Sequence, residues 1–304
     1  MRELTISVVD DIRQSFGSPI KVSKLLAKYP SLIMTLEEPQ RSISAYSTVP
    51  WHEFGYDFGL TFPRKRKGVL TGWKWSGYWH SFSVQREEYD RIEVEKTQEN
   101  WTVDITAIDG FGASKEDLRL FESVDEMAKR TYKNLIEDIS VDGLKRCLSH
   151  HGIALIHNPK KTTDFFFTYA WDGRLWLSNT DGSHHTAAAQ YIARRLKKPV
   201  PLTGRLRTYE INGDALRSLF SDYEVFAVDM SDPFAACAFN DAMKDIRATW
   251  LWHHLPKPYH GNGKAVFFPK NDRRSMLVAS EFRRAGGVDL AAFLLSLASP
   301  KAMQ

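Results

Sequence analysis

Cysteine is scarce in this sequence, and long apolar runs are missing from it. The two cysteines, Cys147 and Cys237, lie far apart and form no C-x-x-C pair, which excludes a disulfide framework and a zinc-finger spacing. No run approaches the ~18 apolar residues of a membrane-spanning helix. The first residues, MRELTISVVDDIRQ, carry acidic side chains where a signal peptide has its apolar core. We therefore expect a cytoplasmic protein with two free thiols and no membrane partner.

A strong excess of one charge is missing as well. The 41 basic and 37 acidic residues give a net charge of +4, so the total permits nucleic-acid binding without implying it. Apolar residues make up 43% and aromatic residues 12% of the 304 residues, which is enough for one large or two modest packed domains. No repeat or cofactor motif is present, and the identity of any cofactor stays unknown.

The first part of the chain combines short helices with an aromatic-rich region. Val8–Phe16 and Ser18–Tyr29 are predicted helices, separated at Gly17 and closed by Pro30. Region 51–82 is rich in aromatic residues, and the spacing of Trp73 and Trp75 places both rings on one face of a strand. Together with alternating residues up to 107, it predicts an antiparallel sheet over 45–107.

A basic run interrupts the aromatic-rich region. Basic and aromatic residues interleaved in this way can hold single-stranded nucleic acid by charge and stacking. The alternative is a hairpin whose loop, Pro63–Gly68, is a solvated cationic tip. The candidate nucleic-acid-binding residues are Arg64, Lys65, Arg66 and Lys67.

The rest of the chain alternates helices and strands. Capping boxes predict helices near 115–121 and 124–138, and a further helix runs through Leu144 towards Gly152, a candidate C′ glycine. His150 and His151 fall in its last turn, where cationic side chains complement the helix dipole. Ile153–Ile156 is predicted as a buried strand, and the segments after residue 212 as helices and strands in turn. We therefore expect an α+β fold with domains 1–112 and 113–304, the second a mixed α/β unit.

The stretch around Trp171–Arg195 carries the densest polar chemistry. Phe165–Ala170 and Leu175–Leu177 are predicted as a hairpin, and 186–196 as a helix that precedes a strand near 206–211. The turn between hairpin and helix reads Asn-Thr-Asp-Gly-Ser-His-His. A helix N-terminus offers unpaired N–H groups and partial positive charge, so this turn suits a phosphate or carboxylate.

Each residue of the turn has a candidate role. Gly182 permits close approach of a ligand to the backbone, and Ser183 can donate to a phosphate oxygen. Arg174 and Arg205, on flanking strands, are candidate phosphate clamps. His184 or His185 is the candidate general base or acid, with Asp181 to orient it. The alternative is purely structural: an Asp-Gly-Ser turn that caps a helix, with His185 as a core histidine.

Residues 164–212 resemble the ParB and sulfiredoxin superfamily, in which a strand ends in a D-G-x-H-R type turn before an Ala-rich helix. Asp181, Gly182 and His184 fall on the Asp, Gly and His of that pattern. The resemblance implies a turn that binds nucleotide phosphates. Ser183 stands where sulfiredoxins have their reactive Cys, which argues against that chemistry. His185 stands where the family has Arg, so the planar five-donor fork is missing.

Two classes of function remain open. The first is a nucleotide- or nucleic-acid-phosphate-binding protein, with phosphoester cleavage as the natural reaction; the sequence leaves open whether catalysis occurs. The alternative is a non-catalytic interaction protein, such as a phage or mobile-element inhibitor of a host complex, with surface Trp residues as its anchors. A DNA-binding regulator built on residues 1–40 and the basic run is a third hypothesis. No H-E-x-x-H or similar spacing supports a metal site at the histidines of 253–260.

Overall fold

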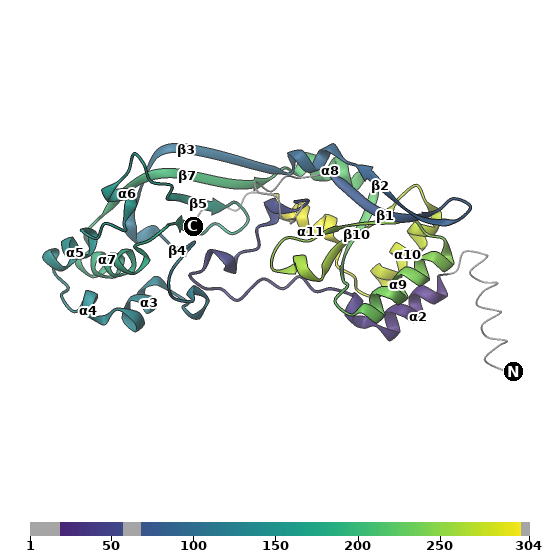
Figure 1. Ribbon diagram of the computed structural model, residues 1–304, viewed down its shortest axis with the longest axis horizontal. Helices are drawn as coiled ribbons and strands as arrows, with labels where there is room; N and C mark the ends of the chain where they lie inside the picture. The colour runs from purple at the N-terminus through teal and green to yellow at the C-terminus, as the bar shows by residue number, and fades with distance from the viewer. Residues whose placement is uncertain (1–18, 57–67, 299–304) are drawn as a thin grey trace. The chain divides into compact units, whose positions relative to one another are not determined.

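The computed structural model describes residues 19–56 and 68–298 (Figure 1). Their contacts divide the described chain into two compact units. Unit 1 contains residues 19–37, 50–56, 68–93 and 211–298, and unit 2 contains residues 38–49 and 94–210. The fold is α+β in both. No described helix has the length and apolar character to cross a membrane.

Unit 1 is built on a five-stranded antiparallel sheet. Its strand order is β2-β1-β9-β10-β8, and every neighbouring pair is antiparallel. The strands are β1 (Val69–Trp75), β2 (Trp79–Gln85), β8 (Tyr223–Asp229), β9 (Trp250–His254) and β10 (Gly263–Pro269). The helices are α2 (Ile20–Lys28), α8 (Gly213–Ser221), α9 (Pro233–Ile246), α10 (Arg273–Arg284) and α11 (Leu290–Leu297). The apolar faces of α2, α9 and α10 share one core with strands β8 to β10.

Unit 2 holds a mixed five-stranded sheet, in the order β3-β7-β5-β6-β4. The β5–β6 pair is antiparallel, whereas β5–β7 and β4–β6 are parallel. The strands are β3 (Glu93–Asp104), β4 (Gly110–Phe111), β5 (Phe165–Tyr169), β6 (Leu175–Ser178) and β7 (Pro201–Ile211). The helices are α3 (Val124–Thr131), α4 (Lys133–Ile136), α5 (Val141–Leu148), α6 (Ala154–His157) and α7 (Ser183–Leu196).

Helix α7 is the centre of unit 2. Its small residues Ala187, Ala188 and Ala189 are fully buried, and Ile192 continues that buried surface. Small side chains let neighbouring helices approach closely, and α3 and α5 both pack on α7. The predicted unit of strand, turn, helix and strand is confirmed here as β6, α7 and β7.

The division into units differs from the predicted domains 1–112 and 113–304. The chain passes from unit 1 into unit 2 within β3 and returns at the end of β7. The C-terminal segment then supplies β8, β9 and β10 to the sheet of β1 and β2. The predicted single sheet over 45–107 is therefore wrong, because β1 and β2 belong to one sheet and β3 to the other.

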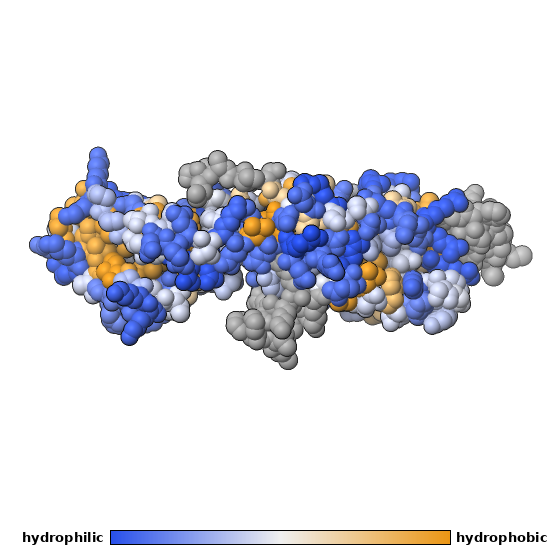
Figure 2. All heavy atoms as spheres, turned by 90° about the horizontal axis from the view of Figure 1, so that it is seen from above, coloured by the Kyte–Doolittle hydropathy of each residue, from blue (hydrophilic) through white to orange (hydrophobic). Residues whose placement is uncertain are grey.

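Two further local expectations need correction. Ile153–Ile156, predicted as a strand, lies at the start of helix α6, because a four-residue apolar run fits either structure. Near 115–121 there is only a 3₁₀ turn at Leu118–Leu120. The predicted first helix and the loop Pro63–Gly68 lie outside the described residues, apart from Gly68, and the described hairpin of β1 and β2 turns at residues 76–78. Figure 2 shows that most of the visible surface is polar, with apolar residues gathered in separate patches.

Candidate functional site

The N-terminus of α7 lies where the sequence places it. Gly182 precedes this 14-residue helix with φ of +75°, and no side chain caps the helix there. A left-handed residue costs a glycine little, so Gly182 lets the chain turn sharply from β6 into α7. Thr186 returns a hydrogen bond from its hydroxyl to the Gly182 carbonyl.

A second segment, residues 150–153, packs directly on this turn. A Cβ on Gly182 would lie 2.5 Å from the Gly152 carbonyl oxygen, and one on Gly152 would lie 3.0 Å from the Asp181 carboxyl carbon. Gly152 is not left-handed, so it is not the C′ glycine that the sequence predicts. A side chain at position 182 would collide with the backbone of residues 152 and 153, whereas one at position 152 would crowd the side chains of His150 and Asp181. This contact covers Gly182, which therefore shapes the corner and does not receive a ligand on that side.

The same segment brings a second histidine pair to the turn. The His150 ring stacks on the His185 ring, with centroids 3.7 Å apart and planes 9° apart, and the His151 ring lies 4.7 Å from that of His150. The Gly152 N–H donates to His150 Nδ1, so the neutral His150 ring carries its proton on Nε2. Burial lowers the pKa of His185, and the neighbouring His150 lowers it further. Both effects disfavour the charged form of His185.

His184 points to the other side of the helix start. Its ring lies 4.0 Å from that of Tyr132, and its Nε2 is 3.9 Å from Glu116 Oε1. That nitrogen is buried and has no hydrogen-bond partner in the described part of the chain. Burial lowers the pKa of His184.

The remaining turn residues are engaged within the protein. Ser183 is buried, and its hydroxyl donates to Ser114 Oγ at 3.0 Å. Asp181 accepts the Gly182 N–H at 2.7 Å; this bond, together with nearby His150, Lys115 and His151, holds the pKa of Asp181 below its ordinary value. Asp181 accepts no hydrogen bond from His184 or His185 in the described residues, so the orienting role expected of it has no direct contact behind it. The exposed groups at the corner are Asp181, His151 and Lys115.

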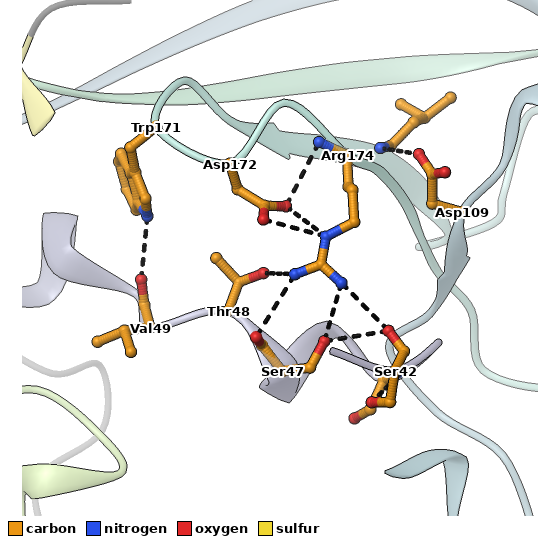
Figure 3. Close-up of polar contacts among 10 residues, drawn as sticks. Ser42, Ser47, Thr48, Val49, Asp109, Trp171, Asp172 and Arg174 are labelled. Carbon is orange, nitrogen blue, oxygen red and sulfur yellow. Dashed lines mark hydrogen bonds and ion pairs between the residues drawn. The ribbon is translucent and has the colours of Figure 1, made fainter. Parts of the chain in front are cut away.

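Arg174 is not a phosphate clamp, because the fold uses all five of its N–H donors (Figure 3). Its Nε donates to Asp172 at 2.9 Å. One terminal nitrogen donates to Ser42 O and Ser47 Oγ, and the other to Ser47 O and Thr48 Oγ1. The guanidinium also lies 4.5 Å from the centroid of Trp176. Arg174 therefore fastens segment 42–48 to the turn between β5 and β6.

Arg205, the second candidate phosphate clamp, forms an ion pair with Glu99 and lines a groove of unit 2. Its Nε donates to Glu99 Oε1 at 2.7 Å, and it lines a groove formed by β3, β7 and the loop after α6. Its two terminal nitrogens have no hydrogen-bond partner among residues 19–56 and 68–298. The candidate nucleic-acid-binding residues Arg64, Lys65, Arg66 and Lys67 lie outside the described residues. Within them, no cluster of three His, Cys, Asp or Glu side chains is arranged to hold a metal ion.

The tryptophans proposed as surface anchors are half-buried. Trp73 and Trp79 stack at 6.0 Å and pack against the core of unit 1. The Arg247 guanidinium lies 4.4 Å from the Trp75 centroid. The most exposed aromatic side chains of the described residues are Phe234, Tyr46 and Tyr78.

Sequence reasoning missed His150, His151, Gly152 and Lys115 at this site. Helix-dipole complementarity gave the two histidines a local explanation, although α5 ends before them at Leu148. The available signal was that the sequence holds a second pair of adjacent histidines next to a glycine, His150-His151-Gly152, besides the pair that follows Gly182 and Ser183.

The comparisons with known proteins give a family and no activity. No curated protein and no solved structure matches the chain. A family model described as "Family of unknown function (DUF6685)" matches residues 98–304, which is more than half of the sequence. The match leaves out residues 38–49 and 94–97 of unit 2. On this match the chain belongs to the DUF6685 family.

Proposed function

We propose that unit 2 binds a phosphate group, as carried by nucleotides or nucleic acids, at the N-terminus of α7. One observation carries the proposal: four imidazoles and the Lys115 ammonium gather around an uncapped 14-residue helix start. Helix N-termini attract anions through their partial positive charge, and imidazole N–H groups add donors. The resemblance of residues 164–212 to the ParB and sulfiredoxin superfamily supports the same ligand class.

The accessible groups define how the anion enters. Gly182 and Ser183 are covered by the protein, so the phosphate meets His151 and Lys115 first and reaches the edges of His150 and His185. Asp181 sits in the same place, and its negative charge favours a ligand that also carries a hydroxyl or an amino group. A nucleotide, with ribose hydroxyls beside its phosphate, has this combination.

The histidine pair supplies the proton chemistry for phosphoester cleavage. Because burial lowers the pKa of His185, its ring is an unprotonated base at neutral pH. In the proposed reaction His185 accepts the proton of the attacking water while the P–O bond to the leaving alcohol breaks, and the leaving oxygen takes a proton from solvent. Lys115 stabilises the charge on the phosphate.

Binding is tested by thermal shift with nucleoside monophosphates and with sulfate. Sulfate stays a dianion between about pH 7.5 and about pH 6, so any change in its affinity over that range reports the histidines. We expect affinity to rise as the pH falls, because protonated imidazoles bind anions better. His151→Gln and His185→Gln should each weaken binding about tenfold, while His80→Gln, in the β1–β2 hairpin, should not.

The proposal fails when millimolar nucleotide and sulfate leave the melting temperature unchanged, or when both site variants bind as well as the wild type. Hydrolysis of a nucleotide phosphodiester, lost in His185→Gln, would establish the catalytic part. Binding without turnover would leave the site as a binding site and refute the cleavage step.

A further inference from the structure

Unit 2 contains a groove that the α7 site does not use. It has a volume of about 400 Å³ and lies between strands β3 and β7 and the segment that follows α6. Pockets of a few hundred cubic ångströms suit small molecules. Its walls combine apolar and charged groups, which restricts the class of ligand that fits.

Part of the lining of the groove is apolar. It consists of Leu155 and Ile156 of α6, of Pro159, and of Pro201 and Leu202 at the start of β7. Ile156 is 38% exposed, although isoleucine is among the residues most often buried. A ligand with an aliphatic side chain would cover this surface and gain hydrophobic free energy.

The charges of the groove are of both signs. Arg205 is held by Glu99 through Nε, and this contact leaves the terminal edge of the guanidinium without a partner in the described residues. Asp164 is 7% exposed, and its Oδ1 accepts the backbone N–H and the hydroxyl of Thr180. With Glu99 and Asp164 against Arg205, the lining is net negative. A simple anion is therefore disfavoured, while a molecule with both an ammonium and a carboxylate matches the charges.

We propose that this groove binds a free amino acid with an aliphatic side chain. The carboxylate pairs with the terminal edge of Arg205, a geometry that guanidinium favours. The ammonium is placed by Glu99 and Asp164, and the side chain covers Ile156 and Pro159. Asp164 also holds Thr180, two residues before Gly182, so an occupied groove stiffens the segment that leads into α7.

Isothermal titration calorimetry of the full chain tests the proposal with three matched probes. L-leucine carries all three features, 4-methylpentanoate lacks the ammonium, and 3-methylbutylamine lacks the carboxylate. Each missing charged group should weaken binding about tenfold or more, because charge-assisted hydrogen bonds are lost.

Three variants distinguish binding in this groove from non-specific binding. Arg205→Gln and Ile156→Ser both change exposed side chains, so folding should persist, as circular dichroism will check. Each should weaken L-leucine about tenfold, while Lys198→Gln should not. The proposal is overturned by absence of L-leucine binding at millimolar concentration, by equal binding of either truncated probe, or by variants that bind like the wild type.

Discussion

Replacement of Arg174 gives the clearest test of the difference between a structural and a ligand-binding arginine. The side chain is buried, with only 10% of it exposed, and Asp172 beside it is 16% exposed. Arg174→Met removes one partner of a buried ion pair and leaves the Asp172 carboxylate and the acceptors of segment 42–48 without their donors. Loss of one partner of this kind costs about 3–5 kcal/mol.

That free energy converts into a measurable fall in thermal stability. For a domain of ~150–250 residues, each kcal/mol shifts the melting temperature by about 2–4 °C. We therefore expect Arg174→Met to melt about 6–20 °C below the wild type. Arg174→Lys keeps the charge but loses the planar fork, and it should lose about 1–3 kcal/mol.

Urea unfolding followed by tryptophan fluorescence measures the change, and a double-mutant cycle with Asp172→Asn isolates the pair. The double variant should be more stable than the sum of the two single effects predicts, because it leaves no unpaired buried charge. Sulfate binding by Arg174→Lys should match the wild type. A loss of less than 1 kcal/mol in Arg174→Met, or loss of anion binding in the folded Arg174→Lys, would refute the structural assignment.

Three further predictions follow from single groups. Gly182→Ala should cost about 3 kcal/mol or more of unfolding free energy, because the strain of the left-handed φ and the clash with the Gly152 backbone add. Gly77 is also left-handed but would have no atom within 4 Å of an added Cβ, so Gly77→Ala should cost only about 1 kcal/mol. Equal costs in urea unfolding would contradict this prediction. Hydrogen bonding to Arg86 lowers the pKa of Glu88 to about 2. Glu88→Gln should therefore lose about 1–2 kcal/mol of unfolding free energy at neutral pH and nothing once the pH falls below about 2. A loss that does not change with pH would contradict this prediction. Folding lowers the pKa of His185. The stability that neutral His185 contributes is therefore complete above the unfolded pKa of about 6.5 and is lost as the pH falls below that value. The free energy of unfolding of His185→Gln should accordingly depend less on pH between about 7.5 and about 5.5 than that of the wild type.

The elements that the sequence predicts well are held by local contacts. β5 and β6 form the expected hairpin around the Asp172–Gly173 turn, and α7 begins directly after Gly182. In both places the turn residue and the hydrophobic pattern agree within a few residues. Helix α2 ends at Lys28, just before Tyr29 and Pro30, for the same reason.

The elements that the sequence predicts poorly depend on partners that are distant in the chain. Ile153–Ile156 carries too short an apolar run to distinguish strand from helix. The sheet of β1 and β2 is completed by strands more than a hundred residues later, and sequence patterns say little about such pairing. The division into units is not contiguous in the sequence for the same physical reason.

The side chains of the candidate site also make contacts with distant residues, which the sequence does not predict. The hydrogen bonds of Arg174 to Ser42 and Ser47 span more than a hundred residues, and the His150–His185 stack joins segments separated by a whole hairpin. Residue type alone therefore suggested a phosphate clamp at Arg174 and a helix-dipole role for His150. The three-dimensional contacts reverse both assignments.

What distinguishes the two kinds of residue is whether the fold satisfies their hydrogen bonds. All five side-chain N–H groups of Arg174 donate to acceptors within the protein, so none is left for a ligand. The buried His184 Nε2 and the outer edge of Arg205 have no hydrogen-bond partner in the described residues. Because a buried polar atom without a partner costs free energy, a ligand that supplies a partner to His184 Nε2 gains binding free energy that Arg174 cannot give. The Arg205 side chain is exposed, so its outer edge can reach a ligand. The expected order of sensitivity is therefore opposite at the two kinds of position: substitutions at Arg174 should change stability and spare binding, and substitutions at Arg205 should change binding and spare stability.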